Sequence, residues 1–142
     1  MAGNWAKLKS TLMEGEVPHI LKQLILFNTS RERGCKYCTE AHGIFANSMS
    51  QMIRTNEYFK VTENLDSPLI PESYRSAIRI VTKAALYPEQ ITDEDFQKLY
   101  DAGFDEQEVQ ELMAQADLAN MLNTIAHLSG IKIDSEFLEA HE

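Results

Sequence analysis

The sequence predicts an all-α fold, a single-domain bundle of about six helices over residues 1–142. Apolar residues recur every three to four positions along several segments, and this is the spacing of one helix face. Gly and Pro number only 6 and 4, too few for the many tight turns of a β-sandwich. At 142 residues and 44% hydrophobic content, the chain can bury a single core.

The N-terminal half is expected to hold a short docking helix and two longer helices. Residues 17–33 carry one apolar stripe, and Gly34 is suited to end that helix. The helical pattern resumes at Lys36 and continues to about Thr55. The docking helix is marked by three apolar residues, Trp5, Leu8 and Leu12.

Three further helices are expected in the C-terminal half, after a loop over residues 64–71. Pro71 suits the first position of a helix, and Pro88 prevents that helix from continuing. A shorter helix is predicted at about 93–102 and a longer one from 106 to 129. The residues expected to be buried in the first two of these helices are Tyr74, Ala77, Ile78, Val81, Ala84, Ala85, Phe96 and Leu99.

Helix starts are marked by two capping patterns. Thr92 is followed by Asp95, and Asp105 by Glu108, each at the spacing of an N-cap and its third helical residue. The second half of the helix over 106–129 is apolar nearly all round, so it is expected to be buried by neighbouring helices or by another subunit. Its polar residues are interpreted as satisfied within the bundle, or as lining the site described next; they are Asn120, Asn123 and His127.

The charge balance disfavours a nucleic-acid or anionic-membrane partner. Acidic residues outnumber Lys and Arg by 22 to 13, and the net charge is −9. Much of the negative charge lies in residues 89–111, where it complements the positive ends of the expected helices. No stretch reaches the length of a membrane span, and Met1 to Lys9 lack the apolar core of a signal peptide. We therefore predict a cytoplasmic protein.

One cluster of residues has side chains that can take part in catalysis: Cys35, Cys38 and His42. On a helix starting near Cys35, the other two lie at about 300° and 340° around the axis, on the core-facing side. A helix N-terminus and the nearby cations Arg31, Arg33 and Lys36 are expected to favour a thiolate. His42 can take the proton of a thiol or return it. The pattern predicts a dithiol that cycles with a disulfide.

Other uses of the same residues remain open at this stage. A zinc site would need a fourth ligand, for which His19, His127 or an acidic residue would have to converge. Such a metal-binding or redox-sensing module would be no enzyme, and inert buried cysteines are a further alternative. Haem attachment requires His directly after the second Cys, where Thr39 stands, and a thioredoxin motif would lie beside a βαβ pattern.

The run Gly34-Cys35-Lys36-Tyr37-Cys38-Thr39-Glu40-Ala41-His42-Gly43 resembles the alkylhydroperoxidase D-like (AhpD-like) branch of the carboxymuconolactone decarboxylase family. The resemblance covers about residues 17–131, and it includes the order of the later helices. It implies an antioxidant enzyme that reduces hydroperoxides or exchanges disulfides, with no metal or organic cofactor. It also implies a homo-oligomer, a trimer or a multiple of one, with helices at the subunit interfaces. A thiol or disulfide reductant protein is expected to restore the thiols.

The resemblance implies a role for each residue of the motif. Cys38 attacks the peroxide, His42 shares its proton, and Cys35 resolves the product into a disulfide. The helix dipole alone would favour Cys35 as the stronger thiolate, because it lies nearer the helix terminus and, by expectation, nearer solvent.

The chain departs from the family pattern at Gln23. The family has a glutamate twelve residues before the first cysteine, which completes a proton relay, and Gln23 stands at that position. An amide cannot carry a proton. Glu32 falls on the opposite helix face, and Glu40 is poorly aimed at the cysteines. We therefore expect weakened peroxidase turnover, with disulfide exchange or redox sensing preserved.

Overall fold

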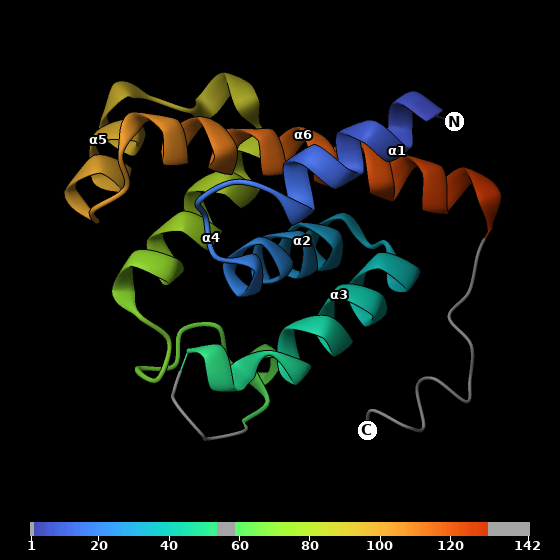
Figure 1. Ribbon diagram of the computed structural model, residues 1–142, viewed down its shortest axis with the longest axis horizontal. Coiled ribbons are helices and arrows are strands. Elements are labelled where there is room, and N and C mark those ends of the chain that lie inside the picture. Colours follow the sequence, from blue (N-terminus) through green and yellow to red (C-terminus); the bar gives the residue numbers. More distant parts are fainter. Residues whose placement is uncertain (1, 54–58, 131–142) are drawn as a thin grey trace.

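The computed structural model describes residues 2–53 and 59–130, and within them it contains six α-helices and no strand (Figure 1). This confirms the predicted all-α fold. The α-helices are α1 Ala2–Leu8, α2 His19–Arg33, α3 Lys36–Ser48, α4 Glu72–Leu86, α5 Asp93–Asp101 and α6 Glu106–Ser129. Short helical turns link them: η1 Lys9–Met13, η2 Ser50–Met52, η3 Val61–Glu63 and η4 Pro88–Gln90. No helix among these residues is long and apolar enough to cross a membrane.

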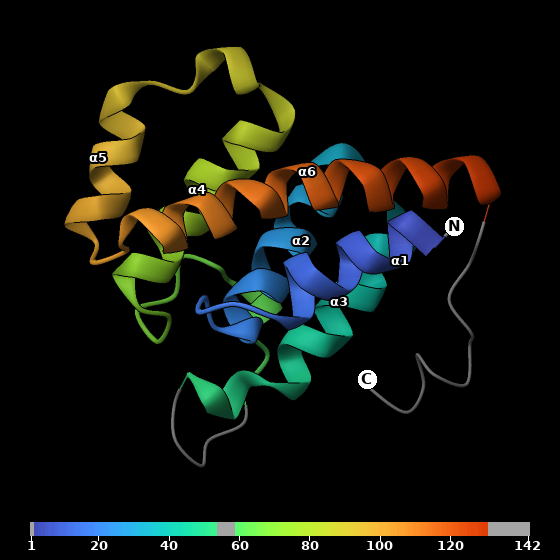
Figure 2. The same cartoon turned by 45° about the horizontal axis from the view of Figure 1, so that its top comes forward.

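Helix α2 forms the centre of the fold, with α3, α4 and α6 packed around it (Figure 2). Most of its length is buried, including polar side chains that the single apolar stripe does not predict. These buried polar residues are Lys22, Gln23, Thr29 and Ser30. Buried polar groups need hydrogen-bond partners, so α2 brings a set of polar side chains to the interior, where a site can form.

Gly34 ends α2 as predicted. Its φ of 78° lies in the left-handed region that glycine adopts without strain, and its N–H donates to the carbonyls of Ser30 and Arg31. The N–H of Cys35 then donates to the Ser30 carbonyl at 2.9 Å. The chain turns back within two residues, so that α3 packs along α2. This turn places Cys35 at the N-cap of α3.

Two helix boundaries differ from the prediction. Helix α3 ends at Ser48, and residues 54–58 lie outside the described residues. The side chain of Asn47 accepts from the N–H of Thr62 at 3.2 Å and donates to its hydroxyl at 2.9 Å, which ties the end of the helix to the next segment. Pro71 is the N-cap of α4 instead of its first residue, because its ψ of 144° is extended.

Both predicted capping boxes are confirmed, at the starts of α5 and α6. The predicted ends of these helices agree with the structure to within one residue. Of the residues expected to be buried in α4 and α5, Ala77, Ile78, Val81, Ala85 and Leu99 are buried, whereas Tyr74, Ala84 and Phe96 are half-buried.

Helix α6 is buried along one side and exposed along the other, in its second half as well as its first. Leu112 and Leu118 are fully buried, but Ile125 is 39% and Leu128 is 85% exposed. The helices of a single chain therefore do not bury the second half all round, because only one side of it meets them, and its burial by another subunit stays a prediction. The docking helix is confirmed through Leu8 and Leu12, which pack against Leu118 and its neighbours, while Trp5 is exposed.

Candidate functional site

The two cysteines lie together at the start of α3. Both are free thiols and both are buried, with 2% of Cys35 and 3% of Cys38 exposed. The expectation that Cys35 lies nearer solvent is therefore wrong. The side chain of Cys35 is within hydrogen-bonding reach of the Cys38 sulfur, and the Cys38 thiol donates to the carbonyl of Leu122 on α6 at 3.8 Å. This proximity is what a reversible disulfide requires.

An apolar pocket of about 310 Å³ opens beside Cys38. His42 and Gln23 also line it, so the structure brings these three predicted residues to one cavity. The remaining wall is mainly apolar and comes from α1, η1, α3 and α6, with Leu12, Leu122 and Ile125 among its members. Such a cavity suits a substrate with a hydrocarbon part and one reactive polar group.

A chain of hydrogen bonds connects His42 to α2. Its Nδ1 lies 2.8 Å from Oε1 of Gln23, and Nε2 of Gln23 lies 3.0 Å from Nε2 of His19. With the amide in this orientation, His42 donates from Nδ1 to the Gln23 oxygen, while the Gln23 nitrogen donates to His19. The Nε2 atom of His42 is then the ring nitrogen that can accept a proton.

The groups in this pocket are held in their neutral forms. Burial lowers the pKa of His42 to about 4. Burial is also the main reason that the pKa of Cys38 is raised to about 12, and the nearby Cys35 thiol raises it further. The hydroxyl of Ser30 acts in the opposite direction. For Cys38, burial is the largest of these influences, and it opposes the thiolate that a helix N-terminus was expected to favour on this cysteine pair.

The cations expected to support a thiolate do not act on the pKa of Cys38. Arg31 lies over the ring of Phe27, 5.1 Å from its centroid, and donates to Asn28. Lys36 is exposed, and neither Arg31 nor Lys36 contributes to the pKa of Cys38. Arg33 donates to the carbonyl of Ala85 at 3.0 Å and lines a different cavity.

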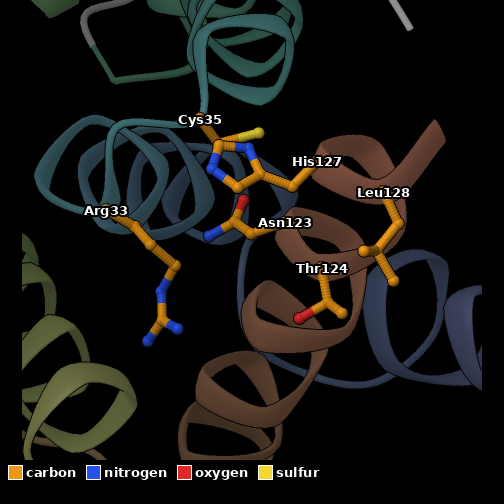
Figure 3. A pocket seen from close by; sticks show the side chains of 6 residues that line it. All are labelled: Arg33, Cys35, Asn123, Thr124, His127 and Leu128. Carbon is orange, nitrogen blue, oxygen red and sulfur yellow. The ribbon is translucent and has the colours of Figure 1, made fainter. Parts of the chain in front are cut away.

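That second cavity, of about 270 Å³, opens beside Cys35 (Figure 3). Its walls come from the end of α2, the N-cap of α3 and the last turns of α6. The lining residues are Arg33, Cys35, Asn123, Thr124, His127 and Leu128. The cysteine pair therefore lies between two cavities, with Cys38 facing one and Cys35 the other. Of the polar residues of α6, Asn123 and His127 line this cavity, and Asn120 donates to the Ala85 carbonyl.

The predicted fourth zinc ligands do not converge on the cysteines. His19 is hydrogen-bonded to Gln23, and His127 lines the cavity on the Cys35 side only. Within residues 2–53 and 59–130, no group of three or more His, Cys, Asp or Glu side chains is arranged to hold a metal ion.

Two polar residues of the site were missed by the sequence reasoning. His19 was considered only as a metal ligand, although it lies four residues before Gln23 and therefore on the same helix face. Ser30 was not considered, yet its hydroxyl donates to Oδ1 of Asn123 at 2.9 Å and acts on Cys38. The helix spacing could have revealed His19, whereas Ser30 reaches Cys38 only through the fold of the α2–α3 turn.

Known structures share this fold. An uncharacterized peroxidase-related protein from Silicibacter sp. TM1040 matches with a TM-score of 0.84 at 18% identity, over 96% of this chain and 71% of its own. An alkylhydroperoxidase AhpD core protein from Ralstonia eutropha JMP134, also an uncharacterized peroxidase-related protein, matches with a TM-score of 0.82 at 21% identity, over 96% and 72%. A protein of unknown function from Agrobacterium tumefaciens, proposed to be the antioxidant defence protein AhpD, matches with a TM-score of 0.70 at 21% identity, over 94% and 90%.

The fold is thus the AhpD-like all-α fold, as the resemblance implied. No protein-family model matches the chain, and no curated protein matches its sequence. At these identities the likeness concerns the fold alone, so the chemistry of the site has to be argued from its own residues.

Proposed function

We propose that this protein is a thiol-dependent peroxidase that reduces organic hydroperoxides through a Cys35–Cys38 disulfide. The observation that carries the proposal is the apolar cavity that Cys38 and His42 both line, together with the interaction between the side chains of Cys35 and Cys38. The antioxidant and peroxidase-related descriptions of the structural neighbours agree with it.

The reaction begins with the Cys38 thiol and His42. As the Cys38 sulfur attacks the outer oxygen of the hydroperoxide, the thiol proton passes to Nε2 of His42 and the O–O bond breaks. His42 returns the proton to the departing alkoxide, giving an alcohol and a Cys38 sulfenic acid. Because burial raises the pKa of Cys38 to about 12, the resting thiol is protonated, and in this proposal its proton is transferred as the sulfur attacks.

Cys35 completes the oxidative half. Its sulfur attacks the sulfenic sulfur of Cys38, water leaves, and the disulfide forms. Two thiols from a reductant then restore the pair. Gln23 positions His42 through the 2.8 Å bond to Nδ1, and because it is an amide it cannot remove the proton. We therefore expect slow peroxide turnover relative to disulfide reduction.

The apolar wall of the cavity favours an organic over an inorganic peroxide. Leu12, Leu122 and Ile125 offer a hydrocarbon chain the contacts that hydrogen peroxide cannot use. The substrate class proposed is therefore a hydroperoxide with an alkyl or aryl group.

Peroxide consumption with a dithiol reductant tests the proposal. Wild-type protein should consume cumene hydroperoxide, and Cys38→Ser should fall to the rate without protein. Without the dithiol, Cys35→Ser should stop after one turnover with a sulfenic acid that a dimedone probe traps. Glu40→Gln, on the same helix and outside the cavity lining, is the matched control and should keep the wild-type rate. Equal rates for wild type and Cys38→Ser would overturn the proposal.

A further inference from the structure

The cavity beside Cys35 has the features of a ligand site, and the peroxide reaction does not use it. The polar side chains that line it include Arg33, Asn123 and Thr124, and each of them can donate a hydrogen bond. Among the described residues no carboxylate pairs with Arg33, whose hydrogen bond goes to the Ala85 carbonyl. Leu128 adds an apolar wall.

Asn123 points independently to a missing partner. It is only 3% exposed, its Oδ1 accepts from Ser30, and its Nδ2 has no hydrogen-bond partner among the described residues. A buried unpaired donor costs about 1–3 kcal/mol, so an acceptor group that reached Nδ2 would be favoured. Figure 3 shows the amide nitrogen of Asn123 on the side of the cavity nearer Arg33.

The placement of the two cysteines says what reaction the cavity serves. A thiolate that opens a disulfide has to approach one sulfur in line with the S–S bond, from the side opposite the other sulfur. Cys38 faces the apolar cavity and Cys35 faces this one. An attack on Cys35 with Cys38 as leaving group therefore comes from the cavity that holds Arg33.

We propose that this cavity binds the reductant, a small peptide-like thiol that carries a carboxylate, and delivers it to Cys35. The carboxylate of the reductant pairs with the guanidinium of Arg33. Figure 3 shows this guanidinium turned away from Cys35, so the carboxylate has to lie several bonds away from the thiol sulfur of the reductant. His127, whose imidazole extends from α6 toward Cys35 in Figure 3, transfers protons for this sulfur. The proposal rests on the Cys35–Cys38 cycle of the proposed function.

The proposed reduction has two steps. The first thiol gives its proton to His127 and bonds to the Cys35 sulfur, the Cys35–Cys38 bond breaks, and Cys38 leaves as a thiolate that is protonated from solvent. A second thiol loses its proton to solvent and attacks the sulfur of the bound peptide. The oxidised peptide disulfide leaves, and the Cys35 thiolate takes the proton back from His127. Two thiols are oxidised and one protein disulfide is reduced.

Reduction of the preformed disulfide tests the site apart from peroxide chemistry. The protein is oxidised with diamide, and the disulfide is reduced with N-acetyl-cysteinyl-glycine or with its carboxamide, which differ in the terminal charge. The acid should react about two- to fivefold faster at low salt, the size expected for one solvent-screened charge pair, and the preference should shrink as salt is added.

Variants locate the charge and the proton transfer. Arg33→Gln should remove the preference for the acid, whereas Arg31→Gln, which loses the same charge two residues away at a side chain outside the cavity, should retain it. His127→Gln should slow the reduction of the disulfide by both peptides and leave the ratio of the two rates unchanged.

Three outcomes would overturn the inference: equal rates for the two peptides with wild type, loss of the preference in Arg31→Gln as well, or unchanged rates in His127→Gln. Because diamide forms the disulfide without peroxide, these failures are distinguishable from failure of the proposed function. That failure would appear as absent peroxide consumption in protein whose diamide-formed disulfide is still reduced by thiols.

Discussion

Cys38 and Asp95 occupy the same position in two helices, but the Cys38 thiol is neutral and the Asp95 carboxylate is ionised. Each is the third residue after an N-cap, Cys35 in α3 and Thr92 in α5, and each is buried, with 3% and 7% exposed. Asp95 accepts from Nζ of Lys83 at 2.8 Å and from the N–H of Thr92 at 3.0 Å, and these donors lower its pKa. The pKa of Cys38 is raised to about 12.

The difference shows that a helix N-terminus does not by itself ionise a buried acid. A cation and the capping-box N–H lower the pKa of Asp95. For Cys38 the Ser30 hydroxyl lowers the pKa, but burial and the neighbouring Cys35 thiol raise it by more. The cysteine site is therefore neutral at rest, and we infer that its reactivity depends on proton transfer when the substrate arrives.

The largest expected effect concerns the stability of this neutral site in acid. The unfolded chain protonates His42 near its ordinary pKa of 6.5, but in the folded protein burial lowers that pKa to about 4. Stability is thus fully present above pH 6.5 and decreases as the pH falls toward 4, by up to about 3 kcal/mol at about 1.4 kcal/mol per pKa unit. Urea unfolding between pH 7 and 4.5 should show this loss, and His42→Gln should reduce it. Parallel profiles for the two proteins would contradict the neutral site.

Removing the charge of Asp95 should destabilise the ionised cap by about 1–2 kcal/mol at pH 7, because Lys83 loses its ion pair and the Thr92 N–H donates to a neutral amide oxygen instead of a carboxylate. The lowered pKa means that the carboxylate stabilises the fold above pH 4 and loses this effect as the pH falls through the folded pKa. Asp95→Asn and wild type should therefore converge in strong acid. Asp101→Asn, an exposed carboxylate on the same helix, is the control and should change stability by less than about 0.5 kcal/mol. A similar loss in both variants would refute the special role of the cap.

Giving the cysteine site a carboxylate should make it resemble the cap. In Gln23→Glu, a negative charge 2.8 Å from Nδ1 of His42 favours the imidazolium and raises the pKa of His42. Peroxide consumption should then rise about tenfold, equivalent to about 1.4 kcal/mol. Gln110→Glu, which adds the same charge at an exposed position of α6, should have no effect. An unchanged rate in folded Gln23→Glu would show that the missing carboxylate is not what slows turnover.

The smallest expected effect is at Ser30. Its hydroxyl is the side chain that favours the Cys38 thiolate, so Ser30→Ala should raise the pKa of Cys38 further. Stopped-flow measurement of Cys38 oxidation should show a decrease of about two- to fivefold, which corresponds to the lower part of the range for one lost hydrogen bond. Ser48→Ala, which removes an exposed hydroxyl from α3, is the comparison variant. Equal rates for both variants would contradict a role for Ser30.

Local rules were enough to predict several parts of this protein. The left-handed conformation of Gly34 and the two capping boxes were predicted correctly, because each depends on a few neighbouring residues. The end of α3 was not predicted, since it depends on hydrogen bonds from Asn47 to Thr62, which lies in the next segment. The placement of Gln23 beside His42 came from a family resemblance, because their contact joins two helices.

The sequence by itself determined the helices, their caps, and the presence of two thiols and an imidazole at helical spacing. Only the tertiary structure decided that Cys38 and Cys35 face different cavities and that the second half of α6 is partly exposed. It also decided that the thiol and imidazole are neutral, against the prediction from the helix dipole. The physical reason is that helix formation depends on near neighbours, whereas desolvation is set by whatever packs around a group, and those partners come from distant parts of the chain.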